Sequence, residues 1–201
     1  MNLENIIEHL YLVIISCVCV TITGIPLGIY SYCRPRWGKL ILTAVDLLQT
    51  VPVLAIMGLL MTVFGANSVT VIIAMVLYLL LPVVRNTNTG LKSVAPVLKE
   101  TADAMGMNRI QKLIQVELPL AFTFILTGIR ITVVTSVGIA VFATFVGGGG
   151  LGSILYRGMR IQDFSVIARG TLCLMAMSVV FDQLLGLLEK KMGGVYEKTK
   201  E

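Results

Sequence analysis

The sequence predicts an all-α polytopic membrane protein with about five transmembrane helices in one domain, residues 1–201. Three observations predict this fold class. Of the 201 residues, 56% are hydrophobic and 13% charged, and the mean hydropathy is +0.90. A soluble domain of this length cannot hide so much apolar surface, so the lipid bilayer is the expected solvent. Five apolar runs can cross a hydrocarbon core of about 30 Å. Basic residues flank these runs, which is typical of membrane topology and does not favour nucleic-acid binding.

The five expected spans cover residues 10–32, 40–64, 68–84, 120–141 and 164–188. The first lacks a basic leader, so we expect a retained span and not a cleaved signal peptide. The third is the shortest and should be the least tilted. Pro26, Pro52 and Pro82 interrupt the runs, which membrane helices tolerate where neighbouring groups satisfy the backbone. Gly24 and Gly28 form a GxxxG pattern, which predicts close packing against another helix or in a dimer seam.

The basic residues orient these spans, because cytoplasmic loops carry an excess of Lys and Arg. The flank before the first span has no Lys or Arg, so we predict that it lies outside. Basic residues follow the first span, fill the loop after the third, and close the chain at Lys190, Lys191, Lys198 and Lys200. Arg157 and Arg160 in the fourth connection do not follow this trend. Twelve of the sixteen basic residues are then cytoplasmic, which favours an N-out, C-in topology.

A charged loop, residues 93–119, separates the third and fourth spans and must face water or a partner. Pro96 suits the first turn of a helix, and an apolar stripe follows at three- and four-residue spacing, formed by Val94, Leu98, Ala102 and Met105. Gly106 permits a sharp turn after this helix. A second amphipathic stretch, 108–117, precedes Pro119, which we expect to start the fourth span. The loop therefore predicts two short helices along the inner surface, either resting on lipid or docked in a protein groove.

The spacing within this loop resembles the EAA loop of ATP-binding-cassette (ABC) importer permeases, Glu-Ala-Ala, three residues, Gly, nine residues, Ile-x-Leu-Pro. This chain has Thr101 and Val116 where the pattern has Ala and Ile. The resemblance implies a type I ABC importer permease fold in which the loop forms a cytoplasmic coupling helix that docks on an ATPase. The residues that it assigns to coupling are Glu100, Thr101, Ala102, Asp103, Met105 and Gly106, and the loop ends at Leu118 and Pro119.

Segments 46–52, 81–92 and 146–152 resemble permeases of the osmoprotectant branch, which move quaternary amines such as glycine betaine, carnitine and choline. The resemblance implies a non-catalytic subunit in the cell membrane of a prokaryote. Its implied partners are a cytoplasmic ATP-binding subunit, a second identical or homologous permease, and an extracellular or periplasmic substrate-binding protein. Because the sequence has no GxxxxGK[ST] loop, we expect no cofactor in this chain, with ATP and Mg bound by the ATPase.

Three alternatives remain open from the sequence. One is an ABC importer permease for another small solute, such as an amino acid. Another is a secondary transporter or channel without an ATPase, although the inverted repeats that would favour it are not evident. The third is a membrane enzyme, for which the sequence offers no convincing catalytic group and no metal-ligand spacing, since His9 is the only histidine.

Charged residues inside spans are costly and tend to be paired or functional. Asp46, Arg130 and Asp182 lie within the second, fourth and fifth expected spans. We expect a structural pair of Arg130 with Asp46 or Asp182, the alternative being a role in gating or substrate contact. Gln49 is expected to line a polar path or to form a helix–helix hydrogen bond.

The fourth connection contains Gly147, Gly149 and Gly152, which formally satisfy GxGxxG. A dinucleotide site needs a βαβ unit around this pattern, whereas here a membrane helix precedes it. We therefore expect a turn or re-entrant element that forms part of an outer gate. The four cysteines are expected to be packing residues, and Tyr32 and Trp37 to be interfacial belt residues.

Overall fold

The computed structural model describes residues 3–197, and all regular secondary structure in this part of the chain is helical, with short connections between the helices. The predicted basic tail positions Lys198 and Lys200 lie outside the described residues. The elements are α1 (Leu3–Cys33), α2 (Pro35–Thr50), α3 (Val53–Phe64), α4 (Ser68–Ser93), α5 (Pro96–Ala104), α6 (Arg109–Lys112), the π-helix η1 (Leu113–Glu117), α7 (Leu118–Ile139), the 3₁₀-helix η2 (Ala140–Val146), α8 (Leu151–Arg160) and α9 (Phe164–Glu197).

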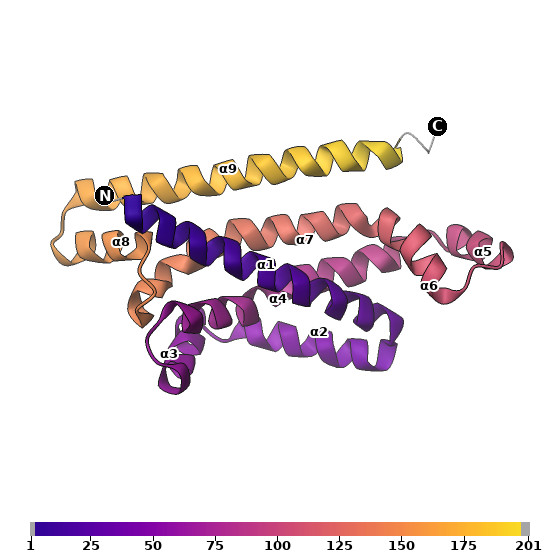
Figure 1. The fold of residues 1–201 in the computed structure, drawn as a ribbon, viewed down its shortest axis with the longest axis horizontal. Coiled ribbons are helices and arrows are strands. Elements are labelled where there is room, and N and C mark those ends of the chain that lie inside the picture. The colour runs from indigo at the N-terminus through magenta and orange to yellow at the C-terminus, as the bar shows by residue number, and fades with distance from the viewer. Residues whose placement is uncertain (1–2, 198–201) are drawn as a thin grey trace.

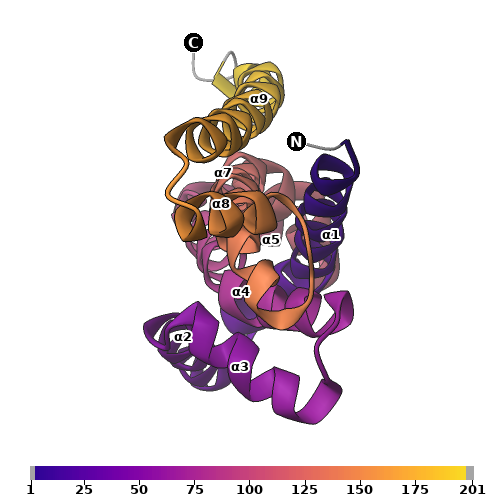
Figure 2. The ribbon, with the colours of Figure 1, turned by 90° about the vertical axis from the view of Figure 1, so that its left-hand side faces the viewer.

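The long helices run along one axis of an elongated bundle (Figure 1), with α4 at its centre. Helix α4 packs against α1, α2, α3 and α7, whereas α9 packs on α7 and α8. Figure 2 shows α9 on one side of this bundle and the α2–α3 pair on the other. The core is apolar, with Leu12, Met57, Met75 and Leu79 among its fully buried side chains.

Four described segments are individually long and apolar enough to cross a membrane: Leu3–Cys33, Ser68–Ser93, Arg109–Val146 and Phe164–Lys191. The expected second span is instead a broken pair, because α2 and α3 meet at 95°. Pro52 causes this break. Proline lacks an N–H and disfavours helical geometry in the preceding residue, and Val51 is accordingly extended, with φ −77° and ψ 130°. The prediction of one continuous helix here was wrong, while the count of about five spans is confirmed with the bent pair taken as one.

The third span is longer than expected, since α4 continues nine residues beyond Val84, to Ser93. Hydropathy falls at Arg85, but the helix persists because its polar side chains pack inside the bundle. Thr87 and Asn88 are buried, and the Asn88 side-chain amide donates to Ser31 Oγ at 2.7 Å. The span predicted to be the shortest is therefore part of a 26-residue helix.

Glycines bring the central helices into close contact. A Cβ atom added at Gly28 would lie 2.5 Å from Thr87 Cβ, and one added at Gly24 would lie 2.9 Å from Val83 Cγ1. The GxxxG face of α1 therefore packs on α4 of the same chain, which is the intramolecular alternative of the two considered. Gly128 of α7 approaches the Pro82 carbonyl of α4 in the same way, at 2.8 Å from its ideal Cβ.

Candidate functional site

The predicted coupling segment begins with a short, well-terminated helix at one end of the bundle (Figure 1). Pro96 lies in the first turn of α5, where its missing N–H costs no helical hydrogen bond. After α5 the Met107 N–H donates to the Ala102 carbonyl at 3.1 Å, and the Gly106 N–H donates to the Asp103 carbonyl at 3.0 Å. This pair of hydrogen bonds is a Schellman motif, which requires a left-handed residue. Gly106 supplies it, with φ +77°.

Helix α5 buries one small side chain and exposes the rest of the motif. Ala102 is 3% exposed, while Met105 is 70% exposed. The other exposed motif residues are Glu100, Thr101, Asp103 and Gly106. We call this set, with Met105, the α5 surface. The predicted apolar stripe is only half correct, because Val94 and Ala102 are buried but Leu98 and Met105 face outward.

The second half of the loop differs from the prediction of a separate helix lying along the inner surface. Residues 109–139 form one continuous run of helix, made of α6, η1 and α7. Pro119 does not begin this run but lies within its α7 portion, preceded by the π-helical turn. A π-helix widens the turn, and the Leu118 N–H bonds back to the Leu113 carbonyl. Leu118 and Pro119 thus lie where the loop becomes the fourth span, and the extra width accommodates a proline that would otherwise break the helix.

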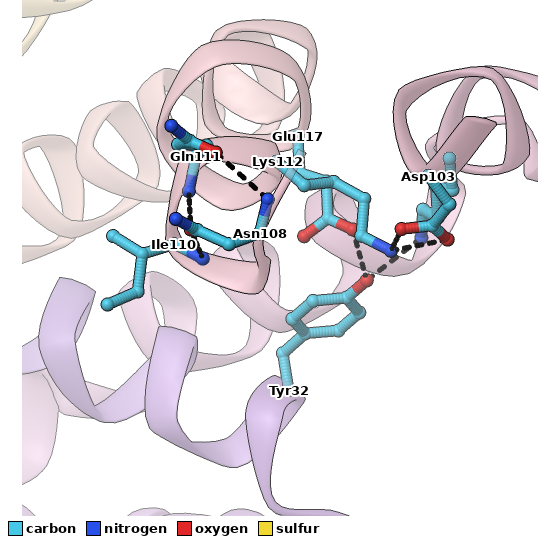
Figure 3. A network of polar contacts seen from close by, with 8 residues as sticks. Tyr32, Asp103, Asn108, Ile110, Gln111, Lys112 and Glu117 are labelled. Carbon is cyan, nitrogen blue, oxygen red and sulfur yellow. Dashed lines mark hydrogen bonds and ion pairs between the residues drawn. The ribbon is translucent and has the colours of Figure 1, made fainter. Parts of the chain in front are cut away.

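Polar contacts fix α5 to the elements around it (Figure 3). Lys112 Nζ of α6 lies 2.6 Å from Asp103 Oδ1. Asn108 and Gln111 form a capping box that starts α6. The ion pair fastens α5 to α6, and the capping box fixes the start of the helix that runs from α6 into α7.

A second set of contacts reaches the core helices. Lys99 Nζ donates to the Tyr32 hydroxyl and to the Leu91 carbonyl, each at 3.0 Å. The Tyr32 hydroxyl in turn donates to Glu117 Oε1 at 3.0 Å, and Glu117 is only 4% exposed. Figure 3 shows Tyr32 of α1 reaching toward Glu117. Helix α5 is thereby connected to η1 and to the C-terminal ends of α1 and α4.

The three intramembrane charges singled out from the sequence, Asp46, Arg130 and Asp182, fall into two separate groups. Arg130 Nε and Nη2 bond the two Asp182 carboxylate oxygens at 2.7 and 2.8 Å, and its Nη1 bonds Glu189 Oε2 at 3.0 Å. This cluster joins α7 to α9. Asp46 is not the partner of Arg130, since it pairs with Arg85 of α4. Gln49 lies on α2, one helical turn from Asp46, and is partly exposed.

The opposite end of the bundle carries the glycine loop, residues 147–150 (Figure 1). Gly147, Gly149 and Gly150 have left-handed φ of +75°, +69° and +80°, so this backbone favours glycine. The Gly150 N–H donates to Glu8 Oε2 at 2.8 Å. A cavity of about 310 Å³ lies between this loop and α1. Gly152 is different, because it lies in the first turn of α8, where an added Cβ would lie only 2.0 Å from the Val141 carbonyl oxygen.

Several residues of these groups were not assigned from the sequence. Tyr32 was expected to be an interfacial belt residue, and Glu117 occupies the unspecified position of the motif. Glu8, Arg85 and Glu189 were not singled out as site residues. Each makes its contact with a residue at least 39 positions away, so no local spacing reveals it.

Comparison with known proteins identifies the family of this chain. Residues 24–194 match the family described as "Binding-protein-dependent transport system inner membrane component". The chain is 36% identical over 197 residues to the glycine betaine/carnitine/choline transport system permease protein OpuCD of Bacillus subtilis, covering 98% of this chain and 86% of that protein. It is 35% identical to the carnitine transport permease protein OpuCD of Listeria monocytogenes (98% and 89% covered). It is 37% identical to the osmoprotectant import permease protein OsmW of Salmonella typhimurium (90% and 87% covered).

Solved structures show the same fold. A chain of the inward-facing MetNI methionine ABC transporter superimposes with a TM-score of 0.86 at 20% identity, over 94% of this chain and 95% of that one. A chain of an amino acid ABC transporter crystallised with histidines gives 0.79 at 16% identity, over 94% and 92%. The predicted ABC importer permease fold is therefore confirmed. With the family matched over most of its length, this chain belongs to the inner membrane components of binding-protein-dependent transport systems.

Proposed function

We propose that this chain is the permease subunit of an ATP-driven importer for quaternary-amine osmoprotectants such as glycine betaine, carnitine and choline. One observation carries the substrate class. The relatives at 35–37% identity cited above are named as permeases for these solutes or for osmoprotectants, whereas the amino-acid transporters share the fold at only 16–20% identity. The curated relatives are thus much closer in sequence, which favours their solutes over amino acids.

The α5 surface is the proposed contact through which the ATPase drives transport. An ATP-binding subunit in the cytoplasm would bind Glu100, Thr101, Asp103 and Met105, while the buried Ala102 lets α5 lie close against the rest of the permease. Exposure of these side chains and the sharp turn at Gly106 support this assignment. ATP and Mg would be held by that subunit, and its closure would move α5.

The proposed pathway lies between this chain and a second permease, identical or homologous. Asp46 and Arg85 support the location, because their side chains are 41% and 54% exposed although both lie on membrane helices. Exposed charges on membrane helices avoid lipid and face a partner or an aqueous path. We assign Asp46 and Gln49 to the surface that faces this pathway. We assign the Arg130–Asp182 pair a structural role, in which it holds α9 on α7.

The glycine loop is the proposed outer gate, where an external binding protein would deliver the solute. Gly147 and Gly149 supply left-handed backbone there, and Gly152 allows α8 to pack against the Val141 carbonyl. The Glu8 contact supports a gate that is closed in this structure, because it fastens the loop to α1.

Uptake in reconstituted vesicles tests the proposal. The permease would be assembled with its ATPase and binding protein, and labelled choline, carnitine, glycine betaine and methionine compared. Uptake of the quaternary amines that requires ATP, with no competition by methionine, is the expected result. Preference for methionine would overturn the substrate class, and uptake independent of ATP would overturn the ABC mechanism.

Photo-crosslinking tests the docking site separately. A photoreactive residue would replace Met105 on the α5 surface or, as a matched control, Met159, which is exposed on α8 at the other end of the bundle. We expect crosslinks to the ATPase from Met105 only. Crosslinks only from the residue at position 159 would place the ATPase at the α8 end of the permease and would overturn the proposed docking site.

A further inference from the structure

Helix α5 has few direct contacts with the core of the bundle. It packs chiefly on α6 and η1, and its C-terminal half is fastened to α6 through Asp103 and Lys112. Among the described residues, the side-chain hydrogen bonds from α5 to α1 and α4 all come from Lys99. A displacement of α5 therefore has one polar route to those two helices.

That route is a continuous chain of donors and acceptors. The Lys99 ammonium donates a hydrogen bond to the Tyr32 hydroxyl, and this hydroxyl donates a hydrogen bond to the Glu117 carboxylate. The ammonium also lies 5.1 Å from the centroid of the Tyr32 ring, a cation–π distance. The hydroxyl thus lies between a cation and an anion and bonds both, which makes these hydrogen bonds charge-assisted and stronger than neutral ones.

Burial makes the chain costly to break. Glu117 is 4% exposed, so loss of the Tyr32 hydrogen bond would leave one oxygen of a buried carboxylate without this partner. The arrangement is therefore expected to move as a unit, with α5, the inner end of α1 and the base of α7 displaced together.

We propose that Lys99, Tyr32 and Glu117 form the linkage that transmits movement of α5 to the membrane helices. This inference rests on the proposed function, in which α5 binds the ATPase. Lys99 and Tyr32 would act as positioning residues. They need not contact the ATPase or the solute, but they couple ATP hydrolysis to the reorientation of α1 and α7.

The reconstituted complex provides the test, with solute uptake and ATP hydrolysis measured on the same vesicles. Tyr32→Phe removes the hydroxyl but keeps the ring. Tyr30→Phe is the matched control, because Tyr30 is an exposed tyrosine on the same helix. For Tyr32→Phe we expect hydrolysis to continue and uptake per ATP to fall about tenfold, the size that loss of one charge-assisted hydrogen bond predicts. Tyr30→Phe should match the unaltered chain.

Lys99→Met provides a second variant that does not alter α1. It should lower uptake per ATP to a similar degree. The double variant Tyr32→Phe/Lys99→Met should lower uptake per ATP no further than the more affected single variant, because both substitutions interrupt the same chain of hydrogen bonds. If either single variant assembles and keeps the control's uptake per ATP, the linkage is overturned. Loss of assembly in both single variants would also overturn it, since the network would then be only structural.

Failure of the underlying function gives a different pattern. If the α5 surface does not bind the ATPase, the complex that carries the photoreactive residue at position 105 will show no crosslink to the ATPase, even with the native Tyr32. A Met105 crosslink with normal coupling in Tyr32→Phe would instead retain the docking site and reject only the linkage.

Discussion

At the scale of single residues, Gly106 is a position where the backbone conformation, and not the packing, requires glycine. Its φ is +77°, yet an added Cβ would meet nothing within 4 Å. The cost of substitution is therefore conformational, about 1–2 kcal/mol for a side chain that resists the left-handed region. We predict that Gly106→Val reduces ATP-driven uptake several-fold, whereas Gly106→Asn, which tolerates that region, reduces it much less.

Vesicle uptake and copurification of the ATPase would measure both Gly106 variants. A valine variant with unchanged uptake would show that the turn after α5 is not needed for coupling. Equal loss in the two variants would instead indicate that side-chain size at this position matters, because asparagine is accepted by the backbone.

The residue scale also shows what sequence spacing can reveal. The motif located Gly106 and Ala102, whose roles depend on neighbours within a few positions. It gave no role to Glu117, whose hydrogen-bond partner Tyr32 is 85 residues away. The same limit applies to Asp46 and Arg130. Their depth in the membrane indicated that each needs a partner, but the choice of Arg85 and Asp182 depends on how the helices pack.

At the scale of elements, hydropathy predicted the spans but not their shape. Pro26 and Pro82 lie inside α1 and α4, while Pro52 separates α2 from α3. All three prolines remove an N–H, yet the helix continues through Pro26 and Pro82 and bends only at Pro52, a difference that the residue type alone does not predict. The π-helical turn before Pro119 is a similar case, since it joins two stretches that the sequence presents as separate into one continuous run of helix.

Close packing of α1 on α4 leads to a prediction about glycine. Gly28→Ala would place a Cβ 2.5 Å from Thr87 Cβ, and overpacking of this kind costs about 1–3 kcal/mol. We predict that this variant lowers the thermal unfolding temperature in detergent. Gly138→Ala is the matched control, because its Cβ would meet nothing within 4 Å and alanine favours a helix by about 0.5–1 kcal/mol. Equal effects of the two variants would contradict the close contact.

The ion cluster between α7 and α9 gives a second prediction at this scale. Arg130 makes three hydrogen bonds to Asp182 and Glu189, in the fork geometry of a guanidinium. We predict that protease resistance of α9 falls in the order wild type, Arg130→Lys, Arg130→Met, because lysine keeps the charge but not the fork. Arg157→Met is the control, since Arg157 is exposed on α8 and forms no ion pair with the side chains described for residues 3–191. A lysine variant as sensitive as the methionine variant would show that charge alone is insufficient.

At the scale of the whole molecule, the two ends of the bundle carry different chemistry. Helix α5 and its polar contacts lie at one end, and the glycine loop with α8 lies at the other (Figure 1). The distribution of basic residues predicted this separation, although Arg157 and Arg160 on α8 oppose the general trend. Both arginines are exposed on a short helix that packs on α9, which is consistent with a position in a polar interface and not within lipid.

The N-out, C-in topology therefore yields a prediction for the intact membrane. Met105→Cys on α5 and Met159→Cys on α8 would each be made together with Cys33→Ser, because Cys33 is the exposed native thiol. A membrane-impermeant maleimide should label Cys at 159 in whole cells and Cys at 105 only after permeabilisation. The reason is that the excess of basic residues holds the α5 end in the cytoplasm. The reverse labelling pattern would invert the topology, and it would place the α5 surface where a cytoplasmic ATPase could not reach it.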